Sequence, residues 1–247
     1  MFRSLLAGAM SLAPARALQA AWGRAGAAVP GRCAVCAAWL AHPVCEACVR
    51  RFAQPLPRCR RCALRVAPGV EVCGGCLRTP PPLDACHAAV AYGYPWAACI
   101  AAFKFRGEAG WARPLALLLR STPWVEPALE AADLVLPMPL SPQRLRERGF
   151  NQAALLARLL APRRCDATLL LRLRPTARQV GLDRAARLRS LRGAFALDPL
   201  RAAALAGRRV VLVDDVMTTG ASLYAAAAVL RQAGAARVTG LVVARTD

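Results

Sequence analysis

The chain has 247 residues, of which 57% are hydrophobic, enough for one domain of good size and a smaller one. Its 34 basic and 14 acidic residues give a formal net charge of +20, which predicts attraction to polyanions such as nucleic acid or phosphorylated substrates, although a solvated basic surface would explain much of this charge. No apolar run is long enough to span a bilayer, so we expect no transmembrane segment.

Residues 1–30 are rich in alanine and only weakly amphipathic. The apolar stretch after Arg3 is broken by Gly8 and Pro14, which argues against a secretory signal. We expect a loosely docked helix or tail here. The cysteine pattern that follows favours a reducing compartment, so we expect a cytoplasmic protein.

Eight of the 11 cysteines form four CxxC pairs, separated by 8, 10 and 10 residues. Two thiolates separated by two residues can bend round one cation, and two such knuckles complete a tetrahedral sulfur shell that suits zinc. The spacing therefore predicts two structural zinc ions, with the ligands Cys33, Cys36, Cys45, Cys48, Cys59, Cys62, Cys73 and Cys76.

Other interpretations of these cysteines are weaker. A redox role competes for any single CxxC pair, and a disulfide framework would require an oxidising compartment. Consecutive pairing of the knuckles closes the shortest loops and is favoured, with a cross-braced pairing of first with third as the alternative. Cys86, Cys99 and Cys165 stand alone among apolar residues and are expected to be small core residues.

The proline-rich segment 78–84 predicts a stiff joint between two domains. We therefore expect a helix or tail at residues 1–30, a double zinc ribbon at 31–80 and a larger domain at 81–247. A ribbon of this kind docks a protein partner or nucleic acid, or braces its neighbour, and the sequence does not choose between these roles.

The larger domain alternates predicted strands and helices. Strands are expected at 85–94, 132–141, 168–176, 208–216 and 236–247, and helices after Trp96, from Pro114, at 149–162 and at 221–235. This order predicts an α/β fold with a mostly parallel sheet covered by helices on both faces.

The stretch VVLVDDVMTTGAS, residues 210–222, places two acids at the end of a buried strand and follows them with a hydroxyl-rich turn. Ligands of such sheets bind at the carboxyl ends of strands, where Asp214 and Asp215 can accept hydrogen bonds from a ribose diol. The turn then opens a helix, whose N-terminus favours an anion. Capping of the helix by Asp215 or Thr218 is the alternative, but it explains only one acid and one hydroxyl.

This stretch resembles the signature that binds 5-phosphoribosyl-1-pyrophosphate (PRPP) in the type I phosphoribosyltransferases. The resemblance implies binding of PRPP, with Mg²⁺, by Asp214, Asp215, Val216, Met217, Thr218, Thr219, Gly220, Ala221 and Ser222. It also implies pyrophosphate or loop contacts from Pro137, Met138, Arg148 and Arg178. Residues 176–195 stand where that fold carries a mobile catalytic loop.

The order of the CxxC pairs, FKFRGE, PMPLSPQRLRERGFNQ, TARQVGLDRAARLRSLRGAF and VLVDDVMTTGAS resembles the ComF family, also called GntX-like. Its members combine a double zinc ribbon with a phosphoribosyltransferase domain and are associated with natural competence. One departure is Ser190, where the family commonly has asparagine.

Three functions are considered. The favoured one is an accessory protein of DNA uptake that handles incoming single-stranded DNA and whose pocket binds PRPP or a nucleotide. The segment from Arg144 to Arg192, with 13 arginines and three acids, would track phosphates. The alternative is an active phosphoribosyltransferase with an unknown acceptor, and the third is a scaffold whose zinc ribbon docks a protein of the uptake machinery.

Overall fold

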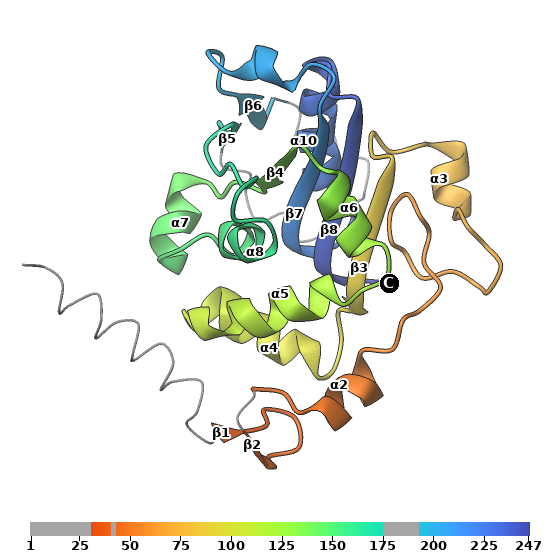
Figure 1. Cartoon of the computed structure of the whole chain (residues 1–247), viewed down its shortest axis with the longest axis vertical. Coiled ribbons are helices and arrows are strands. Elements are labelled where there is room, and N and C mark those ends of the chain that lie inside the picture. Colours follow the sequence, from red (N-terminus) through yellow and green to blue (C-terminus); the bar gives the residue numbers. More distant parts are fainter. Residues whose placement is uncertain (1–30, 41–42, 175–192) are drawn as a thin grey trace, which may run out of the picture. The chain divides into compact units, whose positions relative to one another are not determined.

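The computed structural model describes residues 31–40, 43–174 and 193–247. Packing divides the chain into two compact units, with the boundary between Cys48 and Val49. The elements of the described ranges (Figure 1) are β1 (Gly31–Arg32), β2 (Trp39–Leu40), α2 (Glu46–Phe52), α3 (Gly74–Arg78), β3 (Ala85–Ala91), α4 (Trp96–Phe105), η1 (Ala109–Trp111), α5 (Ala112–Arg120), α6 (Val125–Ala131), β4 (Leu134–Pro137), α7 (Pro142–Arg148), α8 (Gln152–Leu160), β5 (Leu170–Arg172), β6 (Phe195–Leu197), η2 (Ala202–Leu205), β7 (Arg209–Met217), α10 (Ala221–Gln232) and β8 (Arg237–Arg245).

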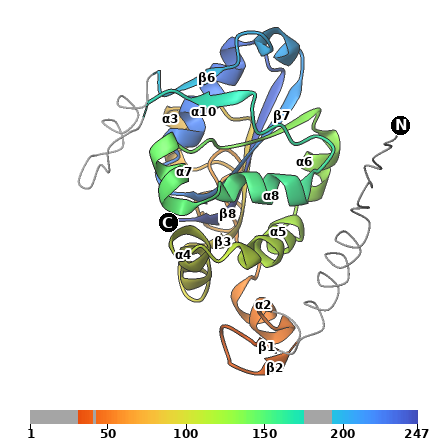
Figure 2. The same ribbon diagram turned by 90° about the vertical axis from the view of Figure 1, so that its left-hand side faces the viewer.

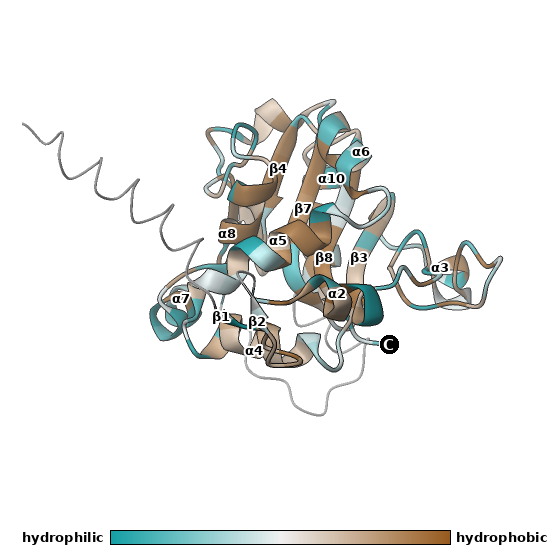
Figure 3. Cartoon of the chain, turned by 60° about the horizontal axis from the view of Figure 1, so that its bottom comes forward, coloured by the Kyte–Doolittle hydropathy of each residue, from teal (hydrophilic) through white to brown (hydrophobic). Residues whose placement is uncertain are grey.

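The larger unit is built on a four-stranded sheet with the order β3-β8-β7-β4, in which all neighbours are parallel. The strands β7 and β8 are central and consist almost entirely of buried residues, as expected for a parallel sheet with both faces covered. Figure 3 shows these central strands as largely hydrophobic. The predicted α/β fold with a parallel sheet is confirmed.

Helices cover both faces of this sheet. Successive residues of a strand point to opposite faces, and the core cluster around α10 contains Val210 and Leu212 but not Val211 or Val213. On the other face, α8 contacts β4 and β7 and α5 contacts β8, while α5 and α8 pack against each other (Figure 2). A separate antiparallel pair, β5 and β6, flanks residues 175–192, which lie outside the described ranges.

Several predicted boundaries need correction. The second helix starts at Ala112, so Pro114 lies in its first turn. The amides of a first turn have no partner within the helix, so a proline there costs no helical hydrogen bond. The predicted helix at 149–162 is shorter, because Asn151 caps α8 and Gly149, with φ +76°, ends a separate helix, α7. Helix α6 was not predicted at all.

The second set of cysteines belongs to the core of the larger unit. Cys59, Cys62 and Cys76 join the cluster that includes Met217 and Tyr224. The amide of Cys86 in β3 donates to the Arg60 carbonyl at 2.8 Å, which ties this segment to the edge of the sheet. Within the described ranges, no helix has the length and apolar content needed to cross a bilayer.

Candidate functional site

A cavity opens where β4 ends beside β7. The ladder between these strands stops at the pair Pro137 and Val213, whereas β7 continues beside β8 to Met217. The acids therefore lie within the strand and not beyond it, and the side of β7 that faced β4 becomes free at this point. The space next to it is a cavity of about 230 Å³, lined by Lys104, Met138, Pro139, Leu140, Arg144, Arg148, Asn151, Gln152, Ala153, Arg172, Asp214, Asp215, Val216, Thr218 and Ser222.

The two acids occupy different environments in this cavity. Asp215 is only 5% exposed, and its Oδ1 lies 2.8 Å from Nζ of Lys104, which reaches it from the end of α4. Asp214 keeps some exposure. Burial, and then the charge of Asp215, raise the pKa of Asp214 to about 7, although Lys104 acts to lower it. Asp214 is therefore the acid whose charge a ligand could most readily change.

The turn after β7 depends on Gly220. Its φ is +81°, and a Cβ there would lie 2.4 Å from Cε of Met217 and 2.6 Å from the Tyr224 ring, so glycine is required twice over. Gly220 precedes α10, a helix of 12 residues, whose first amides and positive dipole end face the turn. The hydroxyl-bearing residues Thr218 and Ser222 line the cavity.

Three arginines also line the cavity. Arg144 and Arg148 come from α7, and Arg172 comes from β5. The carboxamide of Gln152, itself only 1% exposed, accepts from Nη1 of Arg148 at 3.1 Å and fixes this side chain. Burial, and then the charge of Arg144, lower the pKa of Arg172, while the charge of Asp214 acts to raise it. Guanidinium groups gathered in this way suit a phosphate or pyrophosphate.

The structure brings only part of the predicted binding set to the cavity. Asp214, Asp215, Val216, Thr218 and Ser222 line it, as do Met138 and Arg148. Met217 and Ala221 are buried in the core, Thr219 accepts from the Ala221 amide, and Gly220 forms the turn. Pro137 ends β4 just before the cavity, and Arg178 lies outside the described residues.

Several residues that line the cavity were not predicted from the sequence. Lys104 and Arg172 are far from the acids along the chain and reach the cavity through the fold alone. Two signals were available for Lys104: it is the single lysine of the chain, and it lies within the FKFRGE motif. The N-cap of α8, Asn151, donates to the Met138 carbonyl at 3.0 Å and so shapes the loop after β4.

Two larger cavities, of about 500 and 340 Å³, lie elsewhere in the larger unit. Their lining is mainly apolar and includes neither of the paired acids. We place the site in the smaller cavity because polar and charged groups converge there from separate elements.

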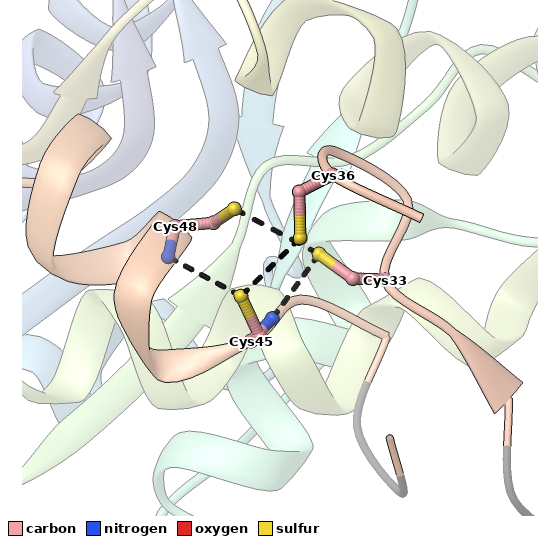
Figure 4. Close-up of side chains that lie close together, drawn as sticks. All are labelled: Cys33, Cys36, Cys45 and Cys48. Carbon is pink, nitrogen blue, oxygen red and sulfur yellow. Dashed lines mark hydrogen bonds between the residues drawn. The ribbon is translucent and has the colours of Figure 1, made fainter. Parts of the chain in front are cut away.

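The eight paired cysteines form two groups of four in the consecutive arrangement, and the sulfur atoms of each group lie within 4.8 Å of one another. Figure 4 shows the sulfurs of the first group directed toward a common centre. The Sγ atoms of Cys33 and Cys48 are 3.9 Å apart, and those of Cys62 and Cys73 are 3.6 Å apart. A tetrahedral zinc with bonds of 2.3 Å requires sulfurs roughly 3.8 Å apart, so both groups fit this ion.

Backbone amides donate to a thiol of each group, and the pKa of both thiols is lowered, whereas burial raises the pKa of Cys48 and Cys62. The Cys45 amide donates to Sγ of Cys33 at 3.4 Å, and the Cys73 amide donates to Sγ of Cys59 at 3.3 Å. Burial acts to raise the pKa of Cys33, but the amides of Cys36, Cys45 and Val35 together lower it to about 6. A thiol of this kind is readily ionised, as a metal ligand must be.

The chain is similar to known proteins over most of its length. The family described as the phosphoribosyl transferase domain matches residues 176–246. The DNA utilization protein YhgH of Salmonella typhimurium is 34% identical over 233 residues, covering 88% of this chain and 98% of that protein. Competence protein F of Haemophilus influenzae is 32% identical over 200 residues, which are 77% of this chain and 85% of that protein.

A third relative, competence protein ComFC of Bacillus subtilis, is 34% identical over 145 residues, which are 58% of this chain and 57% of that protein. The YhgH match covers well over two thirds of both proteins, and the chain carries two groups of four cysteines as well as a match to the phosphoribosyl transferase domain. The chain therefore belongs to the ComF, or GntX-like, family, which joins a double zinc ribbon to a type I phosphoribosyltransferase domain.

Proposed function

We propose that this protein handles single-stranded DNA in the cytoplasm during DNA uptake or utilisation, and that its cavity at the end of β7 binds PRPP or a nucleotide. Relatives named for competence and DNA utilisation support the first part. The cavity supports the second part, because its chemistry suits a sugar phosphate.

The observation that carries the proposal is the convergence of acids, hydroxyls and arginines on one cavity. Asp214 lines this cavity together with Thr218 and Ser222 of the turn and with the three arginines Arg144, Arg148 and Arg172. A ribose offers hydroxyl donors for the acid, and its phosphates offer charge for the arginines and for the N-terminus of α10. Magnesium bound together with PRPP would add neutralisation of the pyrophosphate, and the Asp214 carboxylate is an oxygen ligand of the kind that this ion accepts.

The second candidate function is transfer of the phosphoribosyl group to an acceptor. The ribose and phosphate parts of such a site are accounted for, and catalysis would consist mainly of positioning and charge stabilisation. We recognise no segment in the sequence that would cover a nucleobase acceptor, so binding ranks above transfer.

Isothermal titration calorimetry with Mg·PRPP and with a nucleoside 5′-monophosphate tests the pocket. We expect binding by the wild type and at least a tenfold loss on replacing Asp214 and Asp215 by asparagine. Asp133→Asn is the matched control, because Asp133 pairs with Arg209 at the opposite end of β7. Equal heats from the wild type and the double variant would contradict the assignment of ribose to these acids.

The single lysine provides an independent measurement of the same site. The Lys104 side chain is 15% exposed and lines the cavity, so an amine-selective acylating reagent should modify it slowly. A bound sugar phosphate should slow this further, by about fivefold or more, as followed by peptide mass spectrometry. The chain's N-terminal amine serves as the internal reference.

The zinc ribbon is proposed to dock a protein of the uptake machinery. Its support is compositional, since small metal-stabilised segments commonly serve as interaction modules. Co-purification with the intact protein and with a variant lacking the first cysteine group tests this role, and unchanged partners would contradict it.

A further inference from the structure

A single buried arginine joins the second cysteine group to the turn at the cavity. Arg245 is the last residue of β8 and is only 7% exposed. Its Nε donates to the Cys62 carbonyl at 3.0 Å. Its Nη1 donates to the Met217 carbonyl at 3.2 Å and also to the carbonyls of Thr218 and Thr246.

Both ends of this bridge belong to functional groups. Cys62 is one of the four sulfur ligands expected for the second metal, and Thr218 lines the cavity. Cys62 and Met217 are also members of one core cluster, so packed side chains connect the second cysteine group to the turn.

The contact at Thr218 has a directional consequence. In a trans peptide the carbonyl and the next amide point in opposite directions. When Arg245 holds the carbonyls of Met217 and Thr218 toward itself, the amides of Thr218 and Thr219 are turned the other way. Amides presented by a turn before a helix are the groups that bind phosphate.

Metal occupancy adds an electrostatic component. A zinc ion with four thiolate ligands would carry a formal charge of about −2. The positive guanidinium of Arg245, bonded to the Cys62 carbonyl, would lie close to this negative charge when the group is loaded. Loss of the metal would free the backbone of Cys62.

We propose that Arg245 is a positioning residue that couples metal binding by the second cysteine group to sugar-phosphate binding by the turn at residues 217–222. The ligand part of this proposal rests on the proposed function. Because coupling between two sites is reciprocal, a sugar phosphate should tighten zinc in the second group and leave the first group unaffected.

Hydrogen exchange of the full-length, zinc-loaded protein tests the structural part without any ligand. We expect peptides covering residues 214–224 to exchange about fivefold faster or more in Arg245→Met, which removes the bridge, and in Cys73→Ser, which disables the second group. Cys36→Ser, which disables the first group, should leave these peptides unchanged.

Arg164→Met is the matched control for loss of a structural arginine. Nη1 of Arg164 donates to the carbonyls of Leu129, Glu130 and Ala132 at the end of α6, and Arg164 does not line the cavity. If Arg164→Met loosens residues 214–224 as much as Arg245→Met does, or if Cys73→Ser leaves them unchanged, the coupling is refuted.

A second measurement tests reciprocity. With a zinc-selective chelator present, pulsed alkylation should modify the second group about fivefold more slowly when Mg·PRPP is bound, with no change in the first group and no protection in Arg245→Met. Binding without selective protection would overturn the coupling. Absence of Mg·PRPP binding would instead overturn the proposed function, and the exchange experiment would still decide the role of Arg245.

Discussion

The carboxyl of Asp214 is the group whose ionisation should respond to ligand. Burial, then the adjacent Asp215, raise its pKa from the usual 3.8 to about 7. Because the folded protein holds this proton where the unfolded chain has released it, the contribution of Asp214 to stability falls as the pH rises from about 4 to about 7. A ribose hydroxyl that donates to the carboxylate favours the ionised form.

We therefore predict that binding of Mg·PRPP at pH 6.5 releases roughly half a proton or more from Asp214. Calorimetry in buffers of different ionisation enthalpy measures this number. The ligand's phosphate also titrates in this range, so the relevant quantity is the difference between the wild type and Asp214→Asn. An unchanged proton release in Asp214→Asn would show that Asp214 stays protonated in the complex.

The acids and cysteines were predictable because each forms a local pattern. Asp214 and Asp215 follow a buried strand directly, and the CxxC spacing defines its own geometry. The approach of Lys104 and Arg172 to the acids was not predictable, because the sequence does not show that α4 and β5 will meet the end of β7. Their roles arise from topology.

At the scale of an element, the turn between β7 and α10 should be the least tolerant of change. We predict that Gly220→Ala lowers the free energy of unfolding by about 2 kcal/mol or more, because the added Cβ meets both a left-handed backbone and two close side chains. Binding of Mg·PRPP should weaken as well. Chemical denaturation and calorimetry measure the two effects.

Gly207→Ala is the control that separates these causes. Gly207 has φ +73° in the same unit, but a Cβ there would meet nothing within 4 Å. The free energy of unfolding of this variant should fall by only about 1 kcal/mol, the cost of the left-handed conformation, and its affinity for Mg·PRPP should stay unchanged. Equal losses of unfolding free energy in the two variants would mean that the side chains of Met217 and Tyr224 move away from the Cβ added at position 220 at little energetic cost.

Elements of the site were harder to predict than its residues. No separate helix was predicted at residues 142–148, yet α7 forms there: Ser141 caps it by accepting from the Arg144 amide, and Pro142 suits its first position. The resulting helix is what places Arg144 and Arg148 on the wall of the cavity. Its capping residues were visible in the sequence, but a short helix with no buried face gives no hydrophobic period to detect.

At the scale of the whole molecule, the net charge of +20 has two explanations to separate: general solvation of the surface and the proposed binding of DNA. Exposed arginines near the cavity include Arg146 on α7 and Arg174 after β5. Arg208 and Arg237 are also exposed, but they lie at the amino ends of β7 and β8, whereas the paired acids lie near the carboxyl end of β7. Replacing either pair of arginines therefore removes the same charge, from the carboxyl-end side of the sheet in one case and from the amino-end side in the other.

We predict that single-stranded DNA binds with an affinity that falls steeply with salt, because each contacted phosphate contributes a slope of about −0.7 in log K against log salt. Arg146→Gln with Arg174→Gln should flatten this slope by about 1.4, since two phosphate contacts are lost. Arg208→Gln with Arg237→Gln should leave it unchanged. Filter binding over a salt series measures both. An equal decrease of the salt slope in the two double variants would indicate diffuse attraction to the whole basic surface. Absence of binding at low salt would contradict the proposal that this chain binds single-stranded DNA by itself.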